Sequence, residues 1–223
     1  MDVYEALYTT RAMRRVRPDP IPDDVQARIL DAAIRAPSGG NTQNWRFLVV
    51  DDAGVKARLG PLYRDAMAQL WATAYAERIA RAHENPDDPA SASLLRIVRS
   101  SQHLADHFED VPLFLCAFTR NDASGGSIFP AVWSAQLAAR AEGVGSALTT
   151  ILGIFHKAET FEALGVPADK GWEMACCVSF GYPTGKWGIA ARRPVSEVAY
   201  RNAWGAELGL DVPAPLWQPG SAG

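Results

Sequence analysis

The sequence predicts a layered fold in which helices pack on a β-sheet, of the α/β or α+β class. Two observations carry this prediction. Segments with helical spacing alternate along the chain with short runs of apolar and β-branched residues. The 223 residues are 48% apolar and 21% charged, which is ordinary for a globular protein with one substantial domain or two very small ones.

The first fifth of the chain contains two predicted helices and one strand. Residues 2–9 have their apolar side chains on one side of a short helix. Three prolines within residues 18–22 forbid a helix there, and Asp23 opens the next one. That helix ends in the turn-rich residues 36–41, and residues 45–50 (WRFLVV) predict the first strand.

The middle of the chain predicts long helices around a second strand. Residues 54–84 have the pattern of one helix, and residues 91–108 that of another, with the polar ENPDDP segment between them. Residues 111–118 predict an apolar strand. Residues 129–142 predict a helix that is too apolar all round to lie at the surface.

The last third predicts two more strands and an extended tail. Residues 144–150 and 172–180 are the strands, and residues 157–164 form a short helix between them. From residue 181 the chain is rich in Gly, Pro and aromatic residues, and is expected to be extended. Because such an apolar tail is hard to keep in water alone, we expect it to pack on another surface, such as a partner subunit.

Charge and composition exclude several classes of protein. The net charge of -3 gives no overall attraction to nucleic acid or acidic membranes. There is no signal peptide and no apolar run of some 18 residues, so a cytoplasmic protein is expected. The cysteines Cys116, Cys176 and Cys177 lie in apolar runs and are expected to be buried thiols in a reducing compartment. His103 and His107 have a metal-binding spacing but no third ligand in reach, so no metal is predicted.

Three segments far apart in the sequence point to one ligand. The basic stretch of residues 11–17 can bring two guanidinium groups to one phosphate, either as an extended strand or as a helical turn. The segment APSGGNTQNW, residues 36–45, offers close backbone approach and small polar groups for the edge of a flat heterocycle. The third is Gly-Tyr-Pro at residues 181–183 with Arg-Arg-Pro at residues 192–194, where a late arginine can return to the phosphate. Taken singly, each has an ordinary structural explanation: a solvated basic stretch, a turn, a loop.

In this order and spacing, the three segments resemble the nitroreductase (FMN-dependent) superfamily, and the likeness extends from about residue 2 to residue 199. It implies an α+β fold with a central, mostly antiparallel mixed sheet flanked by helices. It also implies a single domain over residues 1–223, in a homodimer with swapped tails in which residues 181–223 wrap the partner subunit.

The resemblance also implies roles for individual residues. Arg11 and Arg14, joined by Arg192, would hold the FMN phosphate. The segment Leu148-Thr149-Thr150 resembles the one that passes flavin N5 in the iodotyrosine deiodinase-like branch, which makes Thr150 the expected N5 partner and leaves no other catalytic side chain predicted. Contacts to the ribityl chain and isoalloxazine would come from the other subunit. The full set implied in cofactor binding is Arg11, Ala12, Met13, Arg14, Pro37, Ser38, Gly39, Asn41, Leu148, Thr149, Thr150 and Arg192.

The sequence departs from the family pattern at three positions. Ala12 stands where a serine is common, Asn44 stands before Trp45 where a proline is usual, and Ala190 stands where some members have a second basic residue. Because of the last change, we expect Arg15 or Arg193 to contribute more to phosphate binding.

The implied activity is an FMN-dependent oxidoreductase that uses NADH or NADPH. The nicotinamide would deliver hydride to N5, leave, and be replaced by a small electron acceptor such as a nitroaromatic or a quinone, with residues 61–95 covering the pocket. One alternative is a specialised branch enzyme: a reductive dehalogenase, an enamide-forming dehydrogenase or a flavin-fragmenting enzyme. The others are a non-catalytic flavin-storing or redox-sensing protein, and a nucleic-acid binder, which the net charge disfavours.

Overall fold

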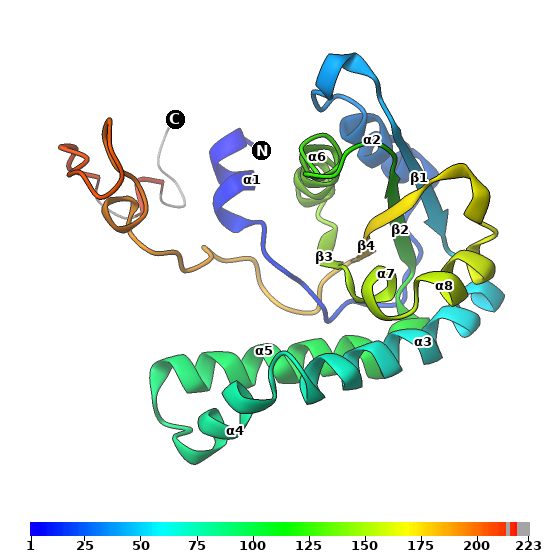
Figure 1. Cartoon of the computed structure of the whole chain (residues 1–223), viewed down its shortest axis with the longest axis horizontal. Helices are drawn as coiled ribbons and strands as arrows, with labels where there is room; N and C mark the ends of the chain where they lie inside the picture. The colour runs from blue at the N-terminus through cyan, green and yellow to red at the C-terminus, as the bar shows by residue number, and fades with distance from the viewer. Residues whose placement is uncertain (213–214, 218–223) are drawn as a thin grey trace. The chain divides into compact units, whose positions relative to one another are not determined.

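The computed structural model describes residues 1–212 and 215–217. Its four-stranded sheet has the order β1-β2-β4-β3, and all three ladders are antiparallel (Figure 1). The strands are β1 (Trp45–Val50), β2 (Leu113–Thr119), β3 (Gly145–Thr149) and β4 (Glu173–Gly181). An isolated parallel bridge joins Ala12 to Ser146 of β3. The α+β class with a mostly antiparallel mixed sheet is thereby confirmed.

Helices cover both faces of the sheet (Figure 1). One face carries α2 (Asp23–Ala33) and α6 (Ile128–Ala141), and the other carries α3 (Ala53–Ala72), α5 (Pro89–Asp106), α7 (Ile151–Phe155) and α8 (Lys157–Leu164). Successive residues of β2 alternate between these layers: Leu115 packs in the first core and Cys116 in the second. A central strand buried on both faces explains the unbroken apolar run in its sequence.

The chain divides into two compact units. The larger unit is Ala12–Lys186 and contains the sheet. The smaller unit is Met1–Arg11 with Trp187–Gly223. In the smaller unit, α1 (Val3–Thr9) is capped by Asp2, whose side chain accepts from two backbone amides, and the amide of Ala190 donates to the Tyr8 carbonyl at 3.2 Å.

Two details differ from the sequence prediction. The helix expected over residues 54–84 is two helices, because the chain leaves helical geometry at Thr73 (φ −115°, ψ −86°) before α4 (Ala76–Glu84) begins. The short α7 had no clear sequence signal, since its five residues are too few to show a period. Short 3-10 helices cover Gly39–Asn41, Phe108–Asp110, Ala168–Lys170 and Val195–Glu197.

The three cysteines are fully buried free thiols, as expected. Cys116 and Cys177 face each other across β2 and β4 with their sulfur atoms 3.8 Å apart. Within the described residues, no helix combines the length and apolarity that crossing a bilayer requires.

Candidate functional site

The basic stretch is extended where it meets the sheet. The amide of Met13 donates to the Ser146 carbonyl at 2.8 Å, and the amide of Arg17 donates to the Tyr182 carbonyl at 2.8 Å. Thr184 donates its amide to the Arg15 carbonyl at 3.0 Å. Of the two conformations left open by the sequence, the structure therefore has the extended one. Residues 12–17 are called the arginine segment below.

Two glycines allow the arginine segment to lie this close. A Cβ atom on Gly145 would lie 2.9 Å from the Cβ atom of Met13. One on Gly181 would lie 2.7 Å from the Cβ atom of Val16. Both distances are shorter than real Cβ contacts, so glycine is required for steric reasons at these two sheet positions.

A pocket of about 200 Å³ lies beside the end of β3. Arg14 comes to it from the arginine segment, and the three-residue stretch Leu148-Thr149-Thr150 from the end of β3. Its other walls come from α3, the turn after it, α5 and α7, through Tyr63, Met67, Leu70, Trp71, Tyr75, Ile97, Ser101, Leu104 and Ile151. We call it the β3 pocket. Four of the residues implied by the sequence thus meet in one place.

Arg14 and Thr150 are two polar residues of the β3 pocket whose side chains are available to a ligand. Arg14 is half-buried, and this burial lowers the pKa of its guanidinium, which nonetheless stays charged. Among the described residues it has no carboxylate partner. Thr150 precedes α7 without capping it, and its hydroxyl has no hydrogen bond to another described residue. A desolvated cation and a free hydroxyl in one pocket fit an electron-rich, hydrogen-bonding molecule.

Arg15 faces a different neighbour from Arg14. Its Nη1 atom lies 3.1 Å from Nδ1 of His103 on α5, so the neutral imidazole accepts from the guanidinium. The His103 and His107 rings lie 4.3 Å apart, and His107 pairs with Asp110 at 3.0 Å. The part of the chain that the structure describes contains no group of three or more metal-ligating side chains. Arg15 therefore ties the arginine segment to α5.

This tie predicts a pH dependence of stability. Burial, and then the positive charge of Arg15, lower the pKa of His103 below its ordinary value of 6.5. The unfolded chain therefore binds this proton more readily, so stability is present above the ordinary pKa and is lost as the pH falls below it. Between about pH 7.5 and about pH 5.5, on either side of that value, the wild type should lose up to about 4 °C more in Tm than His103→Gln. Glutamine still accepts from Arg15 but does not titrate. Equal losses of Tm in the two proteins would contradict this role of His103.

The segment after α2 lies apart from the β3 pocket. The amide of Gly39 donates to Ser127 Oγ at 3.3 Å, next to the start of α6, and the amide of Gln43 donates to Ser38 Oγ at 3.2 Å. Asn41 has a left-handed backbone (φ 54°), which a compact turn of this kind requires. Together with Pro37, these residues do not line the β3 pocket. Their expected contact with a flavin of the other subunit stays a prediction.

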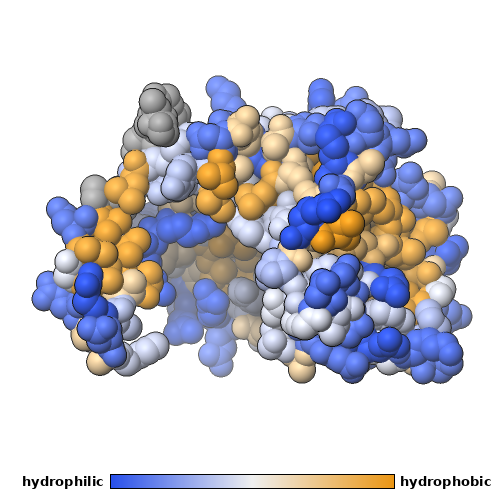
Figure 2. Space-filling view, turned by 90° about the horizontal axis from the view of Figure 1, so that it is seen from above, coloured by the Kyte–Doolittle hydropathy of each residue, from blue (hydrophilic) through white to orange (hydrophobic). Residues whose placement is uncertain are grey.

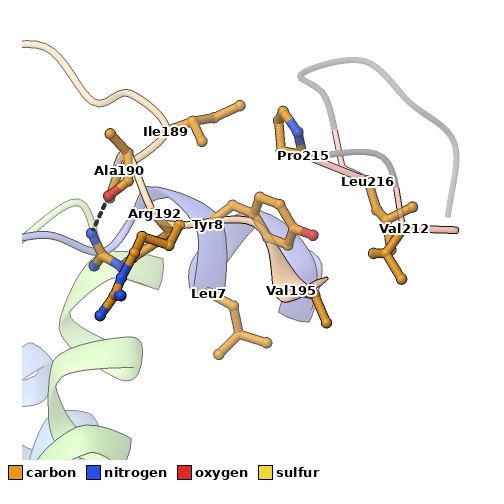
Figure 3. A pocket seen from close by; sticks show the side chains of 11 residues that line it. Leu7, Tyr8, Ile189, Ala190, Arg192, Val195, Val212, Pro215 and Leu216 are labelled. Atoms are coloured by element: carbon orange, nitrogen blue, oxygen red, sulfur yellow. Dashed lines mark hydrogen bonds between the residues drawn. The ribbon is translucent and has the colours of Figure 1, made fainter. Parts of the chain in front are cut away.

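Arg11 and Arg192 belong to the smaller unit. Arg192 and Arg193 line a pocket of about 400 Å³ between α1 and the tail (Figure 3). The Nη1 atom of Arg192 donates to the Ala191 carbonyl at 2.9 Å. The role of Arg11 and Arg192 in phosphate binding also stays a prediction.

Sequence reasoning missed Tyr63, Ser101 and Tyr75 as pocket residues. A signal for Tyr63 was present, because it continues the helical spacing of Leu59 and Met67, and a tyrosine on a buried face needs a partner for its hydroxyl. Ser101 and Tyr75 had no such signal, since their place depends on the turn between α3 and α4.

Comparisons with known proteins agree with this architecture. The Nitroreductase family model matches residues 7–182. A 5,6-dimethylbenzimidazole synthase from Rhodospirillum rubrum is 32% identical over 186 residues, which cover 82% of each chain. Among solved structures, the FMN-dependent nitroreductase NfnB from Mycobacterium smegmatis, in complex with NADPH, has a TM-score of 0.65 at 22% identity, over 90% of this chain and 97% of its own. An iodotyrosine deiodinase bound to FMN and 3-iodo-L-tyrosine has a TM-score of 0.67 at 22% identity, over 91% and 99%. The family match covers well over half of the sequence, and the chain therefore belongs to the nitroreductase family.

Proposed function

We propose that this protein is an FMN-dependent NAD(P)H oxidoreductase that binds its flavin against the β3 pocket. The observation that carries the proposal is the meeting of Arg14, Thr149 and Thr150 in one pocket with aromatic walls. The donor set suits a flavin, since it offers a desolvated guanidinium, a free hydroxyl and apolar surface for a flat ring. Membership in the nitroreductase family supports the same cofactor.

FMN, when bound, supplies the redox chemistry by taking a hydride at N5 from the nicotinamide and passing electrons to an acceptor. Thr150 would hold N5 with its hydroxyl or amide. Arg14 shares the pocket of the threonines, so we assign its charge to the flavin ring, where it offsets negative charge. Of the three arginines that the resemblance implies at the phosphate, Arg11 and Arg192 then keep that role. Pro37, Ser38, Gly39 and Asn41 of a second copy would face the ribityl chain and the ring.

The walls of the β3 pocket favour a flat, apolar acceptor. The side chains of α3 and α5 that line it are aromatic and aliphatic apart from two hydroxyls, and no Asp, Glu or Lys is among the described lining residues. Such walls give no carboxylate partner for an ammonium group. They support nitroaromatics and quinones as acceptors, and residues 63–75 fall within the segment expected to cover the pocket.

Trp71 is the wall residue with the largest expected effect on the acceptor. Its indole nitrogen donates to Gln102 at 3.2 Å, and its ring meets Tyr75 edge-on with centroids 5.4 Å apart. Trp71→Ala should raise KM for a quinone or nitroaromatic about 10-fold, because aromatic stacking and buried area are lost. Trp71→Phe keeps a ring and should stay within about threefold of the wild type. An unchanged KM in the alanine variant would exclude this wall as the acceptor site.

Anaerobic stopped-flow mixing tests the proposed reaction. The FMN-loaded protein should be bleached by NADH or NADPH, and its colour should return when a quinone is added. Tightly bound FMN that neither nicotinamide bleaches would contradict the reductase proposal and favour a flavin-storing or redox-sensing protein.

A second candidate is the flavin-fragmenting branch. The relative from Rhodospirillum rubrum, named a 5,6-dimethylbenzimidazole synthase, is the specific observation in its favour. The product in that name carries the same dimethylated benzene ring as a flavin. Incubation of the reduced, FMN-loaded protein with oxygen, followed by mass spectrometry for 5,6-dimethylbenzimidazole, separates this branch from the reductase.

We also propose that the protein is a homodimer. The smaller unit exposes apolar side chains on α1 and on the tail, including Trp204 at 93%. The same unit has the pocket of Figure 3, whose lining is mostly apolar. On α6 of the larger unit, Phe129 and Trp133 are 41% and 39% exposed. Figure 2 likewise shows hydrophobic residues reaching the surface in several places. A second copy offers the same apolar surfaces by symmetry. Light scattering after gel filtration should give twice the chain mass, and a monomer would contradict the proposal.

A further inference from the structure

Tyr63 is a polar side chain held rigidly inside the larger unit. It lies on α3, is only 2% exposed, and its ring packs against Phe108 with centroids 4.9 Å apart. Phe108 in turn stacks on Phe114 of β2 at 4.2 Å. This aromatic column runs from the helix layer into the sheet, so the position of the Tyr63 hydroxyl is fixed by packing.

Tyr63 shares the β3 pocket with Thr149 and Arg14. Both act on its hydroxyl: a hydrogen bond with the Thr149 side chain and the positive charge of Arg14 each lower the pKa of the phenol. Burial raises the pKa of Tyr63 to about 12, so the phenol is neutral near neutral pH. A neutral phenol can both donate and accept a hydrogen bond. Tyr63 can therefore bond to the Thr149 hydroxyl without neutralising the charge of Arg14.

Thr149 has little else to hold its side chain. It is the last residue of β3 and pairs with Cys177 at the end of the ladder. The next residue, Thr150, has no hydrogen-bond partner for its hydroxyl among the described residues. The contact with Tyr63 therefore holds the Thr149 side chain from the α3 side.

We propose that Tyr63 is a positioning residue, which aligns Thr149 and, through it, Thr150 for the flavin while it faces Arg14. It joins three segments that are far apart in the sequence, at residues 14, 63 and 149. This inference rests on the FMN assignment above. Tyr63 itself acts through Thr149.

The test compares FMN binding by Tyr63→Phe, Thr149→Val and the double variant, with Thr160→Val as the matched control. Thr160 is buried on α8 and does not line the β3 pocket, and its hydroxyl has no hydrogen-bond partner among the described residues. Tyr63→Phe and Thr149→Val should each raise the Kd for FMN about 3- to 10-fold. The double variant should be no more than about twofold weaker than either single one, because both remove the same interaction. Thr160→Val should stay within about twofold of the wild type.

The visible spectrum of the bound flavin gives a second readout, which a general loss of stability would not move. Tyr63→Phe and Thr149→Val should shift the flavin band in the same direction, whereas Thr160→Val should leave it in place. Tyr63→Phe that binds FMN as tightly as the wild type would overturn this inference and leave the proposed function standing. Losses of FMN affinity that add up in the double variant would do the same. A wild-type protein that binds no FMN would overturn the proposed function as well.

Discussion

Arg14→Gln is expected to weaken FMN binding about 10- to 100-fold, the size of a charge-assisted hydrogen bond to a ligand. Arg14 has already lost part of its hydration, because it is half-buried without a carboxylate partner among the described residues. A ring acceptor atom that meets it therefore gains a charge-assisted hydrogen bond at little further desolvation cost. Glutamine keeps most of the side-chain volume and removes the charge. Titration of the apoprotein with FMN, followed by the quenching of flavin fluorescence, measures the change in Kd.

The control for this variant lies three residues further along the same segment. Arg17 pairs with Asp19 at 3.2 Å and lies over the Tyr182 ring, and its side chain is 56% exposed. Arg17→Gln removes the same charge from the chain but not from the β3 pocket, so its Kd should stay within about twofold. Equal losses in the two variants would mean that only the net charge of the segment matters. An unchanged Kd for FMN in Arg14→Gln would show that the flavin binds elsewhere.

Gly181→Ala is expected to destabilise the protein by about 1 to 3 kcal/mol, the usual cost of overpacking. The new methyl group would lie 2.7 Å from Val16 Cβ, 2.8 Å from Val16 Cγ2 and 3.2 Å from Pro112 Cδ. None of these atoms is the end of a long flexible side chain, so backbone must move. The arginine segment is the part that should move, because only isolated bridges join it to its neighbours. Its displacement should also weaken FMN binding, because it carries Arg14. Urea denaturation and the FMN titration measure the two effects.

Gly185→Ala is the matched substitution for this prediction. A Cβ atom there meets nothing within 4 Å, and the variant should stay within about 0.5 kcal/mol of the wild type. If Gly181→Ala is as stable as Gly185→Ala and binds FMN normally, the close approach of the arginine segment is not what positions Arg14.

The sheet and most helices were predictable because their signals are local. β1 and β2 are dense in apolar residues over the length of a strand. The prolines of residues 18–22 fix where α2 begins. The break between α3 and α4 was not predictable in this way. No Gly or Pro stands at Thr73, and the apolar pattern runs through it, so only tertiary packing ends the helix there.

The site was predictable as a set of residues but not as an arrangement. Arg14, Thr149 and Thr150 came from ordered motifs, and the structure brings them together. Whether the basic stretch was extended or helical depended on its bonds to Ser146 and Tyr182, which no local pattern shows. The contacts of Tyr63 and of Arg15 with His103 were missed for the same reason, since each joins side chains far apart in the chain.

The absorbance spectrum of the purified protein, recorded before and after the addition of FMN, shows directly whether this chain binds a flavin. We expect a yellow protein, or an apoprotein that turns yellow, with one FMN bound per chain after gel filtration. The flavin bands should be displaced from those of free FMN, because the ring lies against the β3 pocket. A folded protein that remains colourless after incubation with excess FMN would show that the β3 pocket is not a flavin site.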